Sequence, residues 1–217
     1  FYENDDNANF TLSYISTDVA GVYTVHAADL DGDGDLDVVS AGVQESGDHT
    51  VGGIVWHENT GSHASEDPIF LSYEISTSAD NASSVYAADV DGDGDMDVLS
   101  ASGSDDKIAW YENNGSESFT EHVISTSADM AFSVYAADVD ADGDMDVLSA
   151  SFEDDKVAWY ENDGIERFTE HVISTSADNA MSVYAADVDG DGNMDVLSAS
   201  KDDDKIAWYK QDFQPQT

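Results

Sequence analysis

The sequence contains no cysteine and very few basic residues. Without cysteine the chain can form neither disulfide bonds nor thiolate metal sites, and it has no thiol nucleophile. Six lysines and arginines stand against 48 aspartates and glutamates, which gives a formal net charge of -42 at pH 7. A polyanion of this size repels the phosphate backbone of nucleic acids and anionic membrane surfaces. The composition therefore predicts that nucleic acid is not a partner.

Long apolar runs and enzyme signatures are missing as well. No apolar stretch approaches the roughly 18 residues of a membrane-spanning helix, so we expect no membrane insertion. No signal peptide is recognisable, and because the chain starts at Phe1 without a methionine we expect a processed or excised product. HExxH, GxSxG and phosphate-loop motifs do not occur, and no single histidine and carboxylate constellation stands out. These absences predict that the protein is not an enzyme.

The sequence does contain a repeat of about 50 residues. The segment Trp-Tyr-Glu-Asn and its variants place Trp110, Trp159 and Trp208 at intervals of 49 residues, with Trp56 lying 54 residues before Trp110. Aromatic residues at such fixed positions argue against disorder, which low hydrophobicity and high net charge would otherwise indicate. We expect a single repeat domain over residues 1–217, with repeats at about 5–59, 60–113, 114–162 and 163–211.

Each repeat is predicted to contain four short strands. In the third repeat, runs rich in valine, isoleucine and aromatic residues lie at Phe119–Ser125, Ser133–Asp138, Asp146–Ser151 and Lys156–Asn162. Four strands in roughly every 40 to 50 residues favour an all-β fold, a β-propeller of four-stranded antiparallel blades, over a β-sandwich. The four repeats form either a small ring or part of a larger propeller, and a β-solenoid is the structural alternative.

The ends of the repeat array and two insertions lead to further predictions. If the alanine-rich strand of each repeat is innermost, the last blade, Val183–Tyr209, has only three strands, and the pattern of its missing strand recurs at Phe10–Ser16. We therefore expect the N-terminal strand to complete the C-terminal blade, within one chain or between chains as a route to self-assembly. The rival account is an excised part of a longer propeller. Extra residues around Gln44–Gly53 and Ser62–Pro68 are expected to lengthen surface loops.

An aspartate-rich loop occurs once in each repeat. Carboxylates at alternate positions of a tight loop can converge on a hard cation such as calcium, which takes six to eight oxygen ligands. The loops read DLDGDGDLD from Asp29, DVDGDGDMD from Asp89, DVDADGDMD from Asp138 and DVDGDGNMD from Asp187. We predict about four calcium ions per chain. The predicted metal-binding residues are Asp29, Asp31, Asp33, Asp35, Asp37, Asp89, Asp91, Asp93, Asp95, Asp97, Asp138, Asp140, Asp142, Asp144, Asp146, Asp187, Asp189, Asp191, Asn193 and Asp195.

The register of these loops follows from comparing the four copies. Glycine is invariant at position six, where an ion-binding loop turns sharply and needs a positive φ. Asn193 replaces aspartate at position seven, which is tolerable if that residue coordinates through its carbonyl oxygen. Ala141 replaces glycine at position four, so no left-handed conformation is expected there. The apolar residue at position eight, Leu36 in the first loop, is expected to point inward, and the aspartate at position nine closes the ligand shell. Serine at position twelve, in place of a bidentate glutamate, excludes an EF-hand.

The strand–DxDxDGxxD–strand unit on a blade-length period resembles the FG-GAP or VCBS repeat of integrin α-subunit propellers, secreted bacterial proteins and fungal lectins. The resemblance covers essentially the whole chain. It implies that positions one, three, five and nine supply side-chain oxygens and position seven a carbonyl oxygen. It also implies an extracellular or cell-surface location. The FG and GAP tripeptides themselves are absent, and four repeats stand where propellers of the family usually have about seven blades.

From these observations we expect a non-catalytic, extracellular adhesion or binding module with structural calcium, whose ligand is an extracellular protein or a polysaccharide. Two alternatives remain open. One is a carbohydrate-binding lectin or an accessory domain of a polysaccharide-active enzyme, and the other is a self-assembling surface or filament protein. The repeated tryptophans are expected to pack between blades rather than to stack on sugars.

Overall fold

The computed structural model describes residues 2–4, 10–19, 21–46, 49–61, 68–116 and 118–212. No helix occurs in these ranges, and therefore none that is long and apolar enough to cross a membrane. The described chain consists of seventeen strands. They are β1 (Tyr2–Asn4), β2 (Phe10–Leu12), β3 (Thr24–Ala28), β4 (Asp37–Ser46), β5 (His49–Asn59), β6 (Phe70–Ser76), β7 (Ala82–Ala88), β8 (Asp97–Ser102), β9 (Lys107–Asn113), β10 (Phe119–Ser125), β11 (Ala131–Ala137), β12 (Asp146–Ser151), β13 (Lys156–Asn162), β14 (Phe168–Ser174), β15 (Ala180–Ala186), β16 (Asp195–Ser200) and β17 (Lys205–Tyr209).

The strands form four antiparallel sheets in chain order. The first sheet runs β3-β4-β5-β6, the second β7-β8-β9-β10, the third β11-β12-β13-β14 and the last β15-β16-β17, while β1 and β2 pair with each other. Every sheet thus takes three strands from one sequence repeat, and the first three sheets take their fourth strand from the start of the next repeat. The predictions of an all-β chain, of four-stranded antiparallel sheets and of three strands in the last sheet are confirmed.

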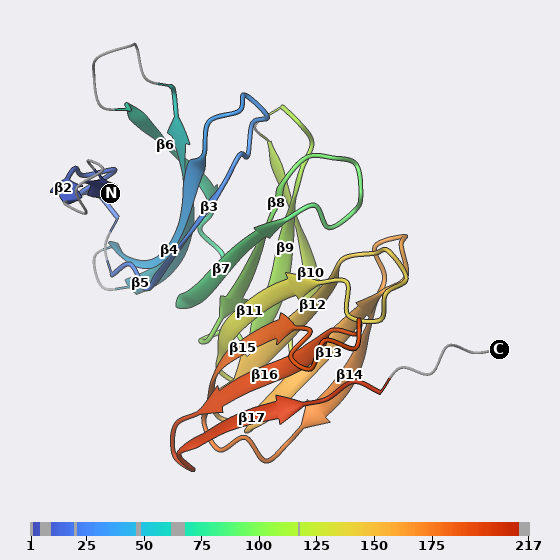
Figure 1. Cartoon of the computed structure of the whole chain (residues 1–217). Helices are drawn as coiled ribbons and strands as arrows, with labels where there is room; N and C mark the ends of the chain where they lie inside the picture. The colour runs from blue at the N-terminus through green and yellow to red at the C-terminus, as the bar shows by residue number, and fades with distance from the viewer. Residues whose placement is uncertain are drawn as a thin grey trace.

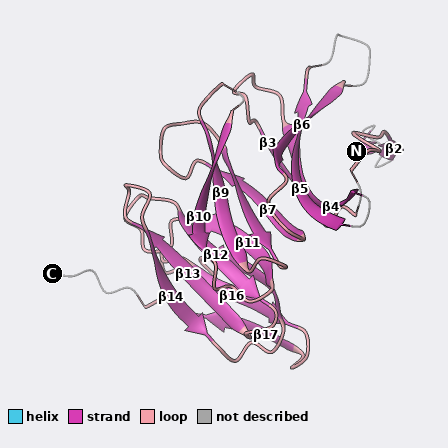
Figure 2. Ribbon diagram, turned by 180° about the vertical axis from the view of Figure 1, so that it is seen from behind, coloured by secondary structure: helices cyan, strands magenta, loops and turns pink. Residues whose placement is uncertain are grey.

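The four sheets follow one another in a row, face against face, as Figures 1 and 2 show from opposite sides. Neighbouring sheets contact each other mainly through the first strand of each sheet, β3 with β7, β7 with β11, and β11 with β15. The first and the last sheet lie at opposite ends of this row (Figure 1). The described residues therefore form an open array, in which the sheets do not close into a ring.

Apolar side chains fill the spaces between successive sheets. Between the first two sheets, Ile54 and Trp56 of β5 belong to one buried cluster with Val98 of β8. The ring of Trp56 meets the edge of Phe119 of β10, with ring centroids 6.3 Å apart. Trp56 and Trp110 are each only 1% exposed, so the prediction that the tryptophans pack between sheets is confirmed for these two. The core is therefore a series of interfaces, each depending on the neighbouring sheet.

A ring occupies the equivalent position in the first strand of each sheet. His26 of β3, Tyr86 of β7, Tyr135 of β11 and Tyr184 of β15 follow one another with centroid separations of 4.4, 4.7 and 4.6 Å. Two alanines follow the ring in each of these strands, and their small size lets the first strands of neighbouring sheets approach closely. Because equivalent residues of these strands lie side by side, the loops that follow them lie at the same end of every sheet.

The first insertion differs from the prediction. The sequence predicts a lengthened loop over residues 44–53, but in the described residues β4 and β5 extend through this region as paired strands, in which Gly42 pairs with Gly53 and Gln44 with Val51. The backbone groups of the paired residues are thus hydrogen-bonded within the ladder itself. In a free loop they would bond to water instead. The second insertion, around Ser62–Pro68, lies almost wholly outside the described residues.

Candidate metal centres

Each aspartate-rich loop joins the first strand of a sheet to the second, as Asp29–Asp37 joins β3 to β4. The glycine at position six has a positive φ in all four loops, as the sequence predicted. The values are +95° at Gly34, +99° at Gly94, +102° at Gly143 and +93° at Gly192. A side chain is disfavoured in this region of backbone space, so glycine sets the sharp turn that folds the loop back on itself.

Position four is also left-handed, which corrects the prediction. Gly32, Gly92 and Gly190 have φ of +74°, +77° and +77°, and Ala141 adopts the same conformation with φ of +62°. Alanine in place of glycine predicts that no such conformation is needed at this position. The third loop therefore has the same shape as the others, although a left-handed alanine costs free energy.

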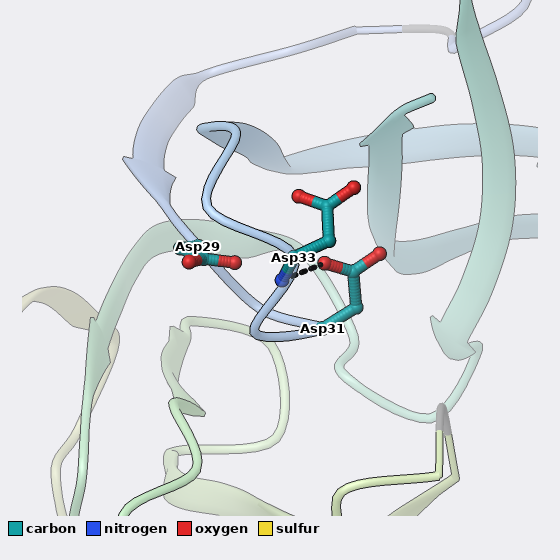
Figure 3. Close-up of side chains that lie close together, drawn as sticks. All are labelled: Asp29, Asp31 and Asp33. Carbon is teal, nitrogen blue, oxygen red and sulfur yellow. Dashed lines mark hydrogen bonds between the residues drawn. The ribbon is translucent and has the colours of Figure 1, made fainter. Parts of the chain in front are cut away.

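The aspartate at position one organises the backbone of its loop. In the second loop, the carboxylate of Asp89 accepts hydrogen bonds from the Gly92 and Gly94 amides at 2.8 and 3.1 Å. Asp29 does the same in the first loop, where Figure 3 also shows the amide of Asp33 donating to the carboxylate of Asp31 at 3.1 Å. These bonds hold the carboxylates of the turn on one side of the loop, near one another.

The aspartate at position nine is the buried member of each loop. Asp97 has no exposed surface, and its two oxygens accept hydrogen bonds from the amides of Val90 at 2.9 Å and Asn113 at 2.7 Å. Burial raises the pKa of Asp97 to about 7 and that of the equivalent Asp146 to about 6, although the two amide bonds act in the opposite direction. A nearby cation would favour the charged form of both carboxyl groups.

Three carboxylates converge in every loop, with their ligand atoms within 4.8 Å of one another. In the last three loops they come from positions one, three and nine, and in the first loop from positions one, three and five. The aspartates at position five of the other loops and the residues at position seven, including Asn193, stand outside these groups. The converging residues are Asp29, Asp31 and Asp33; Asp89, Asp91 and Asp97; Asp138, Asp140 and Asp146; and Asp187, Asp189 and Asp195.

The chemistry of these clusters fits a hard cation. All converging atoms are carboxylate oxygens, and neither a histidine nor a thiolate is among them. The fourth loop holds a cation of the chain itself, because the ammonium group of Lys210 contacts Asp189 and lies 3.2 Å from Asp191. The carboxylates can therefore hold a metal ion.

The residue that faces the loop from the third strand of the sheet differs in charge between sheets. Glu112 contributes to raising the pKa of Asp91, and Glu161 that of Asp140, in both cases after burial and neighbouring loop groups. The equivalent residue after β17 is Lys210. The second and third loops therefore have an additional negative neighbour, whereas the fourth has a positive one and also carries asparagine at position seven.

In the first three loops the apolar anchor is position two, not position eight, whereas Val188 at position two of the fourth loop is 48% exposed. Leu30, Val90 and Val139 are 3%, 2% and 5% exposed, whereas Leu36 at position eight is 62% exposed. The prediction that position eight points inward is wrong for Leu36. Met145 at the same position of the third loop does pack partly against a buried cluster.

Asparagine side chains connect neighbouring loops, a role that the sequence alone did not predict. The Asn113 side-chain amide donates to Met96 O of its own loop at 3.1 Å and to Leu30 O of the preceding loop at 2.7 Å. Asn162 repeats this with Met145 and Val90 at 3.1 and 3.0 Å. The signal is visible in the repeated Trp-Tyr-Glu-Asn segment, whose asparagine ends the third strand of each of the first three sheets, while the last sheet has Gln211 at this position.

Together, the stacked antiparallel sheets and the acidic loop of each sheet define a class of repeat protein with one candidate cation site per repeat. The profile of the FG-GAP-like repeat matches three overlapping stretches of the chain, residues 43–100, 89–149 and 138–198. Since these stretches span well over half of the sequence, the chain belongs to the FG-GAP-like repeat family. A comparison with curated proteins gave no match.

Proposed function

We propose that the chain is a calcium-binding module of an extracellular protein, which binds a protein or polysaccharide ligand without catalysing a reaction. The observation that carries the proposal is the recurrence, at one position of every sheet, of a converging group of three carboxylates. Membership of the FG-GAP-like repeat family supports a binding module.

Calcium suits these loops better than magnesium. Each loop offers several carboxylates and backbone carbonyls in an irregular arrangement, and calcium accepts six to eight such oxygens with flexible geometry. Magnesium demands a near-octahedral shell and keeps several of its waters. Extracellular calcium modules work at dissociation constants of about 10⁻⁴ to 10⁻³ M. We therefore place the module outside the cell or at the cell surface.

The proposed role of calcium is structural. Each loop follows the first strand of a sheet, through which neighbouring sheets contact each other, and Asn113 and Asn162 join the regions of the second and third loops to the loop before. An ion in such a loop offsets the repulsion of its carboxylates, so it stabilises the contact between sheets as well as the loop itself.

A buried histidine that contacts serine has a packing role in this proposal. Nε2 of His57 lies 2.9 Å from Oγ of Ser40, a pair that resembles part of a catalytic arrangement. At the same positions of the third sheet, the Tyr160 hydroxyl lies 3.3 Å from Oγ of Ser149. The contact thus recurs with a residue that is not a general base, which supports a non-catalytic reading.

We further propose that the sheets are blades of a β-propeller whose remaining neighbours cover the two open ends. Val25 of the first sheet is 62% exposed, whereas Val85 and Val134 at its position are each 4% exposed. At the other end Ile206 is 89% exposed, whereas Ile108 at its position is fully buried. Both end faces consist of the residue types that meet between the internal sheets.

Calorimetric titration of metal-free protein with calcium, with native mass spectrometry as a count of bound ions, tests the proposed function. We expect up to four ions per chain, and none in a matched variant in which Asp29, Asp89, Asp138 and Asp187 are all changed to Asn. Folded protein that takes up no calcium at millimolar concentration would refute the proposal. Glycan-array binding then separates a polysaccharide ligand from a protein ligand.

A further inference from the structure

The outer edge of β17 differs from that of every other third strand in a sheet. In the first three sheets a fourth strand pairs along this edge, as β14 pairs with β13 from Asn162↔Phe168 to Val157↔Ser174. Within the described residues, β17 has β16 on one side and no strand on the other. An unpaired edge presents backbone groups that can pair with a further strand.

A cavity lies where this fourth strand would pack. It has a volume of about 190 Å³, and its lining includes Val139, Trp159 and Ile173 of the third sheet with Val196 and Tyr209 of the last. In the complete sheets, the phenylalanine that begins the fourth strand packs at the corresponding interface with the preceding sheet. One example is Phe119, which meets Trp56, and another is Phe168, which packs against the buried cluster of Trp110.

The side chains around the cavity are less buried than their equivalents. Tyr209 is partly exposed, whereas Tyr111 and Tyr160 are each only 1% exposed. Trp159 is likewise partly exposed, whereas Trp56 and Trp110 are 1% exposed. The last interface therefore has space for one further apolar strand. A strand that fits must pair with the edge of β17 and place an apolar side chain in the cavity.

One segment of the chain has the sequence of such a strand. Phe10–Ser16 reads FTLSYIS, and the fourth strands read FLSYEIS at Phe70–Ser76 and FTEHVIS at both Phe119–Ser125 and Phe168–Ser174. All four share the leading phenylalanine and the closing isoleucine and serine. Among the described residues, Phe10–Leu12 pairs with the three-residue strand β1 and with none of the four sheets.

We propose that the free edge of β17 and the adjoining cavity accept Phe10–Ser16 of a second copy of this chain as a fourth strand. By analogy with β13 and β14, Phe10 lies opposite Gln211 and enters the cavity, and Tyr14 lies opposite Ala207. Since each copy has one donor strand and one acceptor edge, the contact is heterologous, and copies associate head to tail.

The donor belongs to another copy because its own chain cannot reach. β2 lies beside the first sheet, and β17 is in the sheet at the far end of the row (Figures 1 and 2). Ser16 and Thr24 are eight residue steps apart, which span at most roughly 28 Å when fully extended. To lie beside β17, the segment would have to pass three sheet spacings of about 10 Å and three strand spacings of about 4.8 Å from β3. This distance is longer than the eight residue steps can span.

Disulfide trapping tests the pairing, because the chain has no cysteine of its own. Variants Tyr14→Cys and Ala207→Cys are prepared separately, mixed in calcium and oxidised. The proposal expects a cross-linked heterodimer as the main product. The out-of-register control mixes Tyr14→Cys with Lys201→Cys, an exposed position in the turn before β17, and should give at least several-fold less cross-linked product.

Light scattering at rising concentration gives a second readout that does not depend on engineered cysteine. The unaltered chain should increase in mass with concentration, and Phe10→Asp should remain a monomer. Tyr14→Ser is the matched control, since its equivalent Val172 is 54% exposed, and it should associate as the unaltered chain does.

Three results would overturn the proposal. One is equal cross-linking of the matched and out-of-register pairs. The second is an internal cross-link within single chains of the double variant Tyr14→Cys/Ala207→Cys, which would show that the strand is donated within one chain. The third is a mass that stays monomeric at every concentration, which would leave the edge of β17 to another protein.

Discussion

The ammonium group of Lys210 lies 3.2 Å from the carboxylate of Asp191 and also contacts Asp189, so a side chain from the end of the last sheet reaches into the fourth acidic loop. Glutamate occupies the equivalent position in the second and third sheets, at Glu112 and Glu161. The four loops are therefore alike in sequence but not in electrostatic surroundings.

Reversing this charge should strengthen the fourth site. We expect Lys210→Glu to raise calcium affinity at that loop by roughly tenfold or more, equivalent to about 1.4 kcal/mol, because a competing cation is removed and an anion added. Titration calorimetry measures the dissociation constant of calcium at each site. The weak fourth site should become similar in affinity to the other sites.

The matched reverse change is Glu161→Lys, which should weaken the third site. Because Glu161 also lies 2.7 Å from Nε2 of His171, the neutral variant Glu161→Gln separates the loss of that contact from the effect of charge. Four sites of equal affinity in the unaltered chain would contradict this account of Lys210 while leaving calcium binding itself intact.

Removal of metal should destabilise the fold. We expect EDTA to lower the melting temperature substantially and added calcium to restore it, since several carboxylates are left together without a counter-charge. A ligand at one hundred times its dissociation constant contributes about 2.7 kcal/mol per site. Differential scanning calorimetry decides the matter, with magnesium at the same ionic strength as the control. An unchanged melt after verified metal removal would count against structural calcium.

Single changes in the third loop should separate its positions. Asp138→Ala and Asp146→Ala should each remove one ion per chain, whereas Asp144→Asn should be mild, because position seven is expected to coordinate through its backbone. Ion counts by native mass spectrometry report the difference. Equal losses from all three variants would show that the assigned register is wrong.

Asp146→Ala should carry an additional cost that Asp138→Ala does not. Asp146 is fully buried and accepts hydrogen bonds from the buried amides of Val139 and Asn162, so its loss leaves two buried donors without partners. The two amides that donate to Asp138 belong to exposed residues and can bond to water instead. Each costs about 1–3 kcal/mol. Urea unfolding in EDTA, where no ion contributes, should therefore rank Asp146→Ala well below Asp138→Ala in stability.

Ala141→Gly should stabilise the protein. Ala141 has a φ of +62°, and relief of that conformation should outweigh the added flexibility of glycine in the unfolded chain by about 0.5–1 kcal/mol. Chemical unfolding in saturating calcium measures it. The reverse change, Gly92→Ala, is the matched control, because nothing lies within 4 Å of the added Cβ and only the backbone cost remains. A stabilising effect of Gly92→Ala would contradict the argument.

Much of the fold could be predicted from sequence because the repeat displays each strand several times. β10, β12 and β13 have the predicted bounds, since alternating apolar residues and turn residues frame them. β11 begins at Ala131, two residues before the prediction, because its pairing shifts between Ala131 and Ser133. Side-chain alternation does not reveal such a bulge, which inserts a residue without changing composition.

The candidate sites were predictable in composition and less so in conformation. The converging carboxylates all belong to the predicted set, but the left-handed backbone of Ala141 and the outward position of Leu36 were not foreseen. Residue type limits backbone conformation only weakly when the penalty is near 1 kcal/mol, and the face of a loop residue depends on the twist of the following strand. The open arrangement of the sheets is likewise a property of contacts far apart in the chain.

The 2.7 Å bond from the side chain of Asn113 to the carbonyl of Leu30 means that the loops are not independent binding units. An ion that orders one loop also fixes an acceptor for its neighbour, and the next ion then meets a partly ordered site. Calcium uptake should accordingly be cooperative along the row, with nearest-neighbour coupling passed from loop to loop. The array would then respond to falling calcium as one linked lattice, losing its ions over a narrower concentration range than isolated loops would.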